Sequence, residues 1–176
     1  MDNTGNHYLK NVKKEFSKMK DLGDRTFSQL KDEDFFFCPD IETNSIAVIV
    51  RHMSGNMLSR WTDFLTADGE KDFRKRDEEF DSLFYTDKDD ILLRWENGWQ
   101  CLFNAIDQLT SEDLLKKVYI RKEEHSVIEA VNRQISHYAY HIGQIIYIAK
   151  FIKNKNWKTL SIPKHKSDEF NKKMGM

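Results

Sequence analysis

The chain has 176 residues, of which 39% are apolar and 32% are charged, so it is long enough for one domain with a substantial hydrophobic core. Its formal charge is −1, which excludes a strong overall field that would attract nucleic acid or an anionic membrane. No run approaches the roughly 20 apolar residues of a membrane span, and no apolar leader follows a basic start, so we expect a cytoplasmic protein.

Apolar residues recur every three or four positions, and only two prolines and seven glycines interrupt them. This period is typical of an all-α protein. We predict amphipathic helices over residues 8–30, 44–67, 88–109 and 126–154, with Asn44 or Ser45 able to cap the second helix. Pro39 breaks the period between the first two helices, where we expect a loop whose aromatic residues cover one end of the core.

The remaining segments are read as connections. Residues 70–81 are nearly all charged, and we predict an ordered surface loop whose charges face solvent. Residues 115–124 are consistent with a short extended piece. The tail, residues 156–176, has no period, but its apolar residues indicate that it lies on the helices; these are Trp157, Leu160, Ile162 and Phe170.

Four long amphipathic helices with a long second connection favour a four-helix bundle, since helices without repeats must bury their apolar stripes against each other. We therefore expect a single domain over residues 1–176, with its core in residues 8–155.

Two histidines of the fourth helix stand out. His137 and His141 are four residues apart, so they share one helix face and could bind one divalent cation. A useful site needs at least a third ligand, and His52 lies in an apolar segment of the second helix. A lone buried histidine is more often a hydrogen-bonded core residue. Three together would leave many polar groups to satisfy, so the set predicts a metal site between the second and fourth helices.

Several neighbours of these histidines have an expected role. Gly143 would let another helix approach closely, and Gln144 could hydrogen-bond a ligand of the site. Tyr138 is expected in the core. Glu96 and Trp99 could face the site from the third helix, but a surface salt bridge and a core residue explain them better.

The cysteines and the other histidines complete the candidates. Cys38 and Cys101 have no CxxC spacing, so no disulfide framework is indicated, and we expect both to be buried as small apolar residues. If Cys101 lay within coordination distance, it would be a fourth ligand and would close the site. We expect His7, His125 and His165 at the surface and assign them no role.

An apolar run ending in His52, followed by His137-x-x-x-His141-x-Gly143-Gln144-Ile, resembles the DinB/YfiT-like superfamily of bacterial metal-binding four-helix bundles. Residues 49–57 and 161–163 are similar to an uncharacterised branch of it. The resemblance implies a divalent metal ion, zinc or nickel, bound by His52, His137 and His141 with open positions for water or substrate. It also implies a homodimer and, by analogy with some relatives, thiol-dependent transferase chemistry with a low-molecular-weight thiol.

Two functions of different classes follow. In the first, the protein is a metal-dependent enzyme in which the ion activates a thiol or water against a small electrophile. In the second, it is a non-catalytic metal-binding or interaction module whose ion fastens two helices. Position 138 is Tyr where the metalloprotease motif H-E-x-x-H has Glu, which argues against peptide hydrolysis, and no catalytic base can be identified.

A third class, nucleic-acid binding, is disfavoured by the near-neutral total charge. The lysine-rich end of the chain is explained by solvation; its lysines are Lys150, Lys153, Lys155, Lys158, Lys164, Lys166, Lys172 and Lys173.

Overall fold

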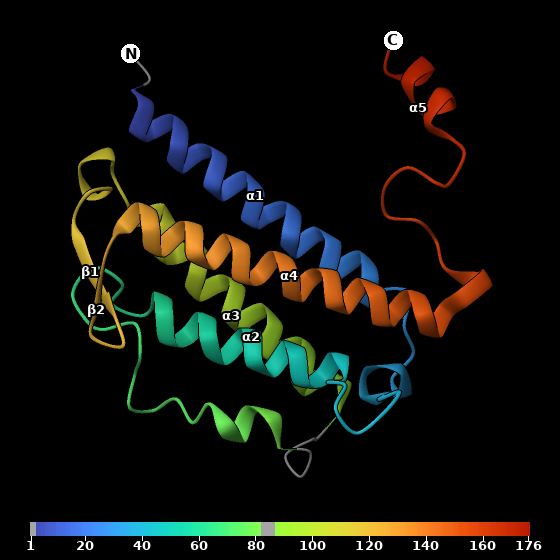
Figure 1. The fold of residues 1–176 in the computed structure, drawn as a ribbon, viewed down its shortest axis with the longest axis horizontal. Coiled ribbons are helices and arrows are strands. Elements are labelled where there is room, and N and C mark those ends of the chain that lie inside the picture. Colours follow the sequence, from blue (N-terminus) through green and yellow to red (C-terminus); the bar gives the residue numbers. More distant parts are fainter. Residues whose placement is uncertain (1–2, 82–86) are drawn as a thin grey trace.

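The structure, a computed structural model, describes residues 3–81 and 87–176 and is mostly helical (Figure 1). Its four long helices are α1 (Thr4–Phe27), α2 (Ile46–Trp61), α3 (Lys88–Gln108) and α4 (Val127–Lys153). They lie side by side, with α2 packed on α3 and α4, and α1 on α4. The prediction of a helical protein is confirmed. In the described part of the chain, every helix is too short or too polar to span a membrane.

Capping residues explain where the helices begin. The Ser45 hydroxyl accepts from the backbone N–H of Val48 (3.2 Å), which confirms one of the two predicted caps of α2. At α4, Ser126 and Glu129 form a reciprocal capping box. The second helix ends at Trp61, earlier than predicted, because Thr62 is extended and Asp63 has a left-handed φ of 50°.

Short elements fill the connections. A hairpin of β1 (Lys117–Ile120) and β2 (Glu123–Ser126) replaces the expected short extended piece, and both residues of its turn have positive φ. The 3-10 turns are η1 (Glu33–Phe36), η2 (Asp77–Phe80), η4 (Ser111–Asp113) and η5 (Asn154–Asn156), and α5 (Ser167–Lys173) ends the chain.

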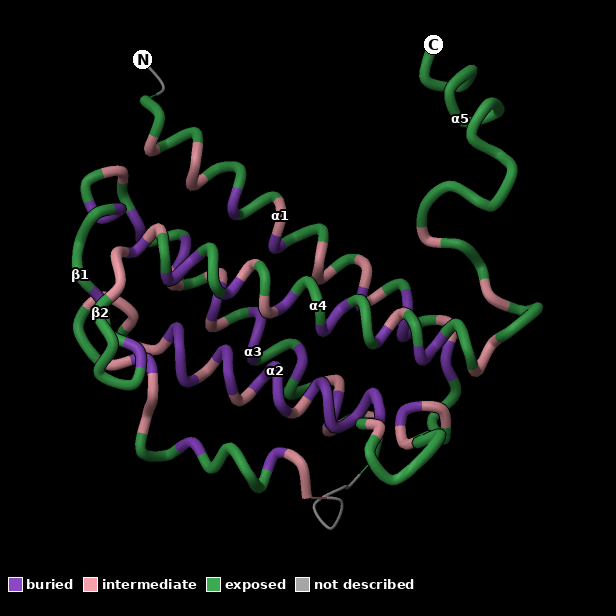
Figure 2. Tube along the Cα trace, viewed as in Figure 1, coloured by how far each residue is buried: buried purple, intermediate pink, exposed green. Residues whose placement is uncertain are grey.

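Each long helix contributes one aromatic ring to the centre of the core. Phe16 of α1 lies 6.0 Å from Trp61 of α2 and 6.3 Å from Trp99 of α3, between ring centroids. Tyr138 of α4 lies 6.0 Å from both Phe16 and Trp99. The Tyr138 hydroxyl accepts from the Trp61 indole N–H (3.1 Å) and donates to the Asn56 side chain (3.0 Å). Tyr138 and Trp99 are therefore core residues, as predicted, and Figure 2 shows that α2 is buried along most of its length.

The tail follows the helices only at its start. Trp157 packs on the core, and Lys158 exchanges hydrogen bonds with the Gln29 side chain. Beyond Leu160 every residue is exposed, and α5 projects away from the four long helices (Figure 1). Ile162 and Phe170, which we expected on the helices, are about 40% exposed.

The cysteines also differ from expectation. Cys38 is exposed, because it follows the last turn of η1 in a loop that leaves the core, and Cys101 on α3 is only half-buried. Among the aromatic residues of the first connection, Phe35 alone is buried, so one ring covers the core end while its neighbours Phe36 and Phe37 are partly exposed.

Candidate metal centre

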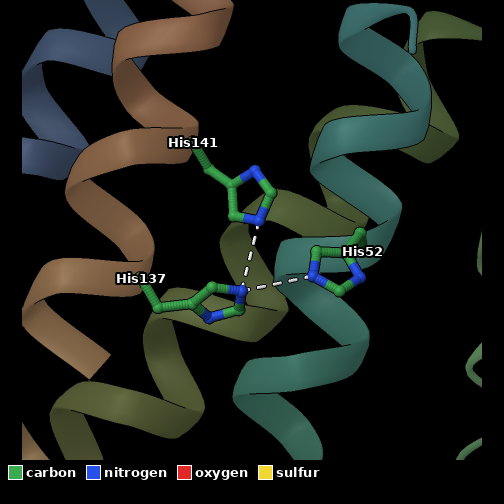
Figure 3. Close-up of side chains that lie close together, drawn as sticks. All are labelled: His52, His137 and His141. Atoms are coloured by element: carbon green, nitrogen blue, oxygen red, sulfur yellow. Dashed lines mark hydrogen bonds between the residues drawn. The ribbon is translucent and has the colours of Figure 1, made fainter. Parts of the chain in front are cut away.

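Three imidazole rings converge between α2 and α4 (Figure 3). His137 Nε2 lies 3.3 Å from His52 Nε2 and 3.2 Å from His141 Nε2, and the nearest nitrogens of all three rings are within 4.8 Å of one another. The one-turn spacing of His137 and His141 aims both rings from α4 toward α2. His52 and His141 are buried and His137 is half-buried.

The outer nitrogens of two rings are fixed by oxygen acceptors. His52 Nδ1 lies 2.9 Å from a carboxylate oxygen of Glu79, and His141 Nδ1 lies 2.8 Å from the side-chain oxygen of Gln144. Because an oxygen acceptor needs a proton from its partner, Nδ1 carries the hydrogen in both rings, and in the neutral tautomer Nε2 then presents a lone pair. Gln144 thus hydrogen-bonds the His141 ring.

The donor set fits a cation. With hydrogen on Nδ1 of His52 and His141, the His137 Nε2–H can donate to only one of the two inward lone pairs. The other lone pair then faces a nitrogen without a proton between them, which is unfavourable in a buried place. A divalent cation among the three Nε2 atoms would satisfy all of them, and a ligand histidine held by a carboxylate through its other nitrogen is the usual arrangement.

The two rings of α4 are neutral in the folded protein at neutral pH. Burial lowers the pKa of His137 to about 3, with the neighbouring charges of His141, His52 and Arg74 adding to the effect. Burial likewise lowers the pKa of His141 to about 4, although the hydrogen bond with Gln144 opposes it. Neutral imidazole is the form that binds metal ions.

The role of Glu79 was not predicted from the sequence. It lies in η2, within the charged stretch that we predicted as a solvated loop, but both Glu79 and Arg74 are buried. The Arg74 guanidinium donates to both carboxylate oxygens, at 2.8 and 2.9 Å. Burial disfavours the charged carboxylate, but hydrogen bonds from His52 and Arg74 outweigh it and keep the pKa of Glu79 below its usual value.

One residue in the sequence marks the place on α2 where Glu79 packs. Gly55 lies one turn after His52 in the middle of α2, where a glycine is costly. A Cβ atom at Gly55 would lie 2.2 Å from a Glu79 carboxylate oxygen. The glycine therefore makes room for the residue that holds the His52 ring.

Other candidates lie elsewhere. Gly143 faces open space, so the predicted close helix approach there is wrong: the residue lies on the exposed side of α4. Glu96 is exposed and pairs with Lys20 (2.8 Å), as the surface reading predicted. Cys101 is not part of the three-histidine cluster found among the described residues, and its Sγ lies 3.6 Å from the Thr62 hydroxyl.

The remaining histidines are outside the cluster. His7 and His165 are exposed, as predicted, whereas His125 on β2 is half-buried, with its Nε2 3.6 Å from Glu123.

A cavity of about 200 Å³ adjoins the cluster. His52 and His137 form part of its wall, together with Gln134 and Tyr140 of α4 and several arginines. One side of the three-histidine cluster thus borders a space that a small molecule could enter.

Comparison with known proteins gives a family without an assigned function. A family model described as "Protein of unknown function (DUF1572)" matches residues 3–166. Searches of the curated proteins and of the solved structures found no significant match.

Proposed function

This chain belongs to the DUF1572 family of proteins of unknown function, and we propose that it binds one divalent metal ion through His52, His137 and His141. The observation that carries the proposal is the convergence of three Nε2 atoms while Glu79 and Gln144 hold the outer nitrogens of two rings. Imidazole ligands suit zinc and nickel, the two ions that we expect.

We extend the proposal to the fold. The packing of the four long helices and the ligand pattern support a DinB/YfiT-like four-helix bundle with a long connection between α2 and α3. The expectation of a homodimer comes from the resemblance alone, and light scattering coupled to size-exclusion chromatography tests it.

Between an enzyme and a structural module, we favour a metal-dependent enzyme that acts on a small electrophile, as a thiol transferase or a hydrolase. Structural zinc sites are usually closed by four protein ligands, whereas three histidines form the cluster here and Cys101 stays apart from it. When bound, the ion would favour the deprotonated form of a thiol or water. The adjoining cavity would admit the substrate, and Glu79 and Gln144 would orient the ligand rings.

Elemental analysis tests metal binding. The protein is purified without chelator and without an affinity tag that carries metal, alongside His52→Ala, His137→Ala and His141→Ala. We expect about one ion per parent chain, loss of the ion in each variant, and no loss in the matched control His7→Ala, whose side chain is exposed. An unchanged metal content in all three variants would refute the proposed metal site.

A second experiment separates enzyme from module. Metal-loaded protein is incubated with a low-molecular-weight thiol and a panel of small electrophiles, and with the same electrophiles in water alone. Turnover that disappears in His137→Ala but persists in His7→Ala supports the enzyme. Stoichiometric metal without turnover on a broad panel, together with a large loss of stability on metal removal, supports the structural ion.

A further inference from the structure

Arginine dominates the cavity beside the three histidines. Five arginines from four segments of the chain form part of its wall: Arg60, Arg74, Arg76, Arg121 and Arg133. No carboxylate lines this cavity within the described residues. A space whose wall gathers guanidinium groups without intervening acids has a positive potential.

Four of these arginines have carboxylate partners outside the cavity wall. Arg74 pairs with Glu79, Arg60 and Arg121 share Glu70, and Arg76 is near Asp77. Because Arg60 and Arg121 share the single carboxylate of Glu70, these three side chains together carry one excess positive charge.

Arg133 is the exception. It has no ion pair with any residue that the structure describes, although it lies one turn before His137 on the same face of α4. It lines the same cavity as His137, so its positive charge lies beside the site. A guanidinium with five N–H donors and no carboxylate partner therefore lies next to a proposed metal ligand.

Two of the residues that line the cavity each have a buried side-chain atom without a partner. Arg60 and Gln134 are 4% and 3% exposed, and neither the Arg60 Nε–H nor the Gln134 side-chain oxygen has a hydrogen-bond partner. Such groups are costly when they stay unsatisfied. One is a donor that matches an anion, and the other is an acceptor that matches a hydroxyl or another N–H or O–H group.

We propose that this cavity binds a small organic anion that also carries a hydrogen-bond donor, and that this anion is the substrate of the metal centre. Arg133 would bind the anionic group, whether carboxylate or phosphate, since both match the guanidinium fork. The cavity is smaller than the roughly 300–1,000 Å³ typical of drug-sized ligands, so the ligand is small. The role as substrate rests on the proposed metal function, but binding of the anion does not.

The test measures anion affinity with and without metal. Acetate, glycolate and methyl phosphate are titrated into the protein as purified and after metal removal, and dissociation constants are taken from NMR shifts of backbone amides near Arg133. We expect binding in both forms, tighter for glycolate than for acetate because its hydroxyl meets Gln134. Whichever of acetate and methyl phosphate binds more tightly identifies the anionic group.

Arginine variants locate the site. Arg133→Gln should weaken binding roughly tenfold to hundredfold, the value of a charge-assisted hydrogen bond, and Arg133→Lys should restore part of it. Arg25→Gln is the matched control, since Arg25 is exposed on α1 and does not line the cavity. Absence of binding by every anion, or equal loss in Arg25→Gln, would overturn the site, and equal affinity for acetate and glycolate would overturn the donor requirement.

The two proposals fail separately. If the purified chain contained no metal but still bound the anion, the anion site would be supported and the metal centre would be refuted. Stoichiometric metal without anion binding would leave the metal centre and remove the inferred substrate class.

Discussion

Replacing Glu79 by Gln tests the most specific feature of the site, the carboxylate that holds the His52 ring. The substitution keeps the shape and one acceptor oxygen but removes the charge. A charge-assisted hydrogen bond contributes about 1.5–3 kcal/mol and a neutral one about 0.5–1.5 kcal/mol, so the contact with His52 should lose roughly 1–1.5 kcal/mol. This loss is about a tenfold weaker metal affinity, at the lower end of the roughly 10–100-fold effect of partners that orient metal ligands.

The same substitution has a second effect on stability. Arg74 donates two hydrogen bonds to Glu79 and would be left as a buried charge without its partner. Removing one member of a buried pair costs roughly 3–5 kcal/mol, so the metal-free protein should unfold at a lower urea concentration. Metal affinity must therefore be measured under conditions where Glu79→Gln is folded.

Competition with a chromophoric chelator gives the zinc dissociation constant, and urea unfolding of metal-free protein gives the free energy of unfolding. Glu78→Gln is the matched control, because it makes the same chemical change at the neighbouring residue, whose side chain is exposed. If folded Glu79→Gln bound zinc as tightly as the parent and as Glu78→Gln, the assigned role of the carboxylate would be refuted.

Gly55→Ala gains roughly 1 kcal/mol of helix propensity but displaces the Glu79 carboxylate, so chelator competition should show weaker zinc binding without loss of helix; unchanged affinity would contradict the close contact. In metal-free protein, His137 and His141 have folded pKa values of about 3 and 4, below the ordinary 6.5, so only the unfolded chain takes up their protons as pH falls from about 6.5 toward 4. The free energy of unfolding should therefore decrease over this range, and urea titrations that gave a flat profile would rule out neutral buried rings. Tyr138→Phe leaves two buried polar partners unsatisfied, which should lower the free energy of unfolding by about 1–3 kcal/mol, while zinc affinity stays the same; a loss of zinc without destabilisation would place the hydroxyl in the site instead.

Helical periodicity explains what could be predicted from the sequence. The four long helices follow from apolar residues at three and four spacing, and the meeting of His137 and His141 follows from one turn of helix. His52 could be predicted as the third member of the histidine cluster, because a polar ring on an apolar helix face needs hydrogen-bonding or ligand partners. The cap at Ser45 follows from the same local chemistry.

Residues outside the helices could not be placed in this way. Glu79 and Arg74 lie in a connection without a period, where charge predicts solvation and only a tertiary contact reveals burial. The arginine-lined cavity is formed by residues of α2, α4, the second connection and the hairpin turn, so no local sequence pattern predicts it. At Gly143 the sequence predicted a contact that the structure lacks. A small residue close to His141 suggested that another helix packs there, but Gly143 lies on the exposed side of α4.

The distance along the chain between the proposed ligands has a consequence for biosynthesis. His52 and His137 are 85 residues apart, and Glu79 lies between them in sequence. During translation, the ring and its carboxylate emerge well before the helix that carries the other two histidines. An ion could be bound by all three histidines only after α4 has been synthesised. Any stabilisation by the ion would therefore apply to chains that include α4 and not to shorter truncated products.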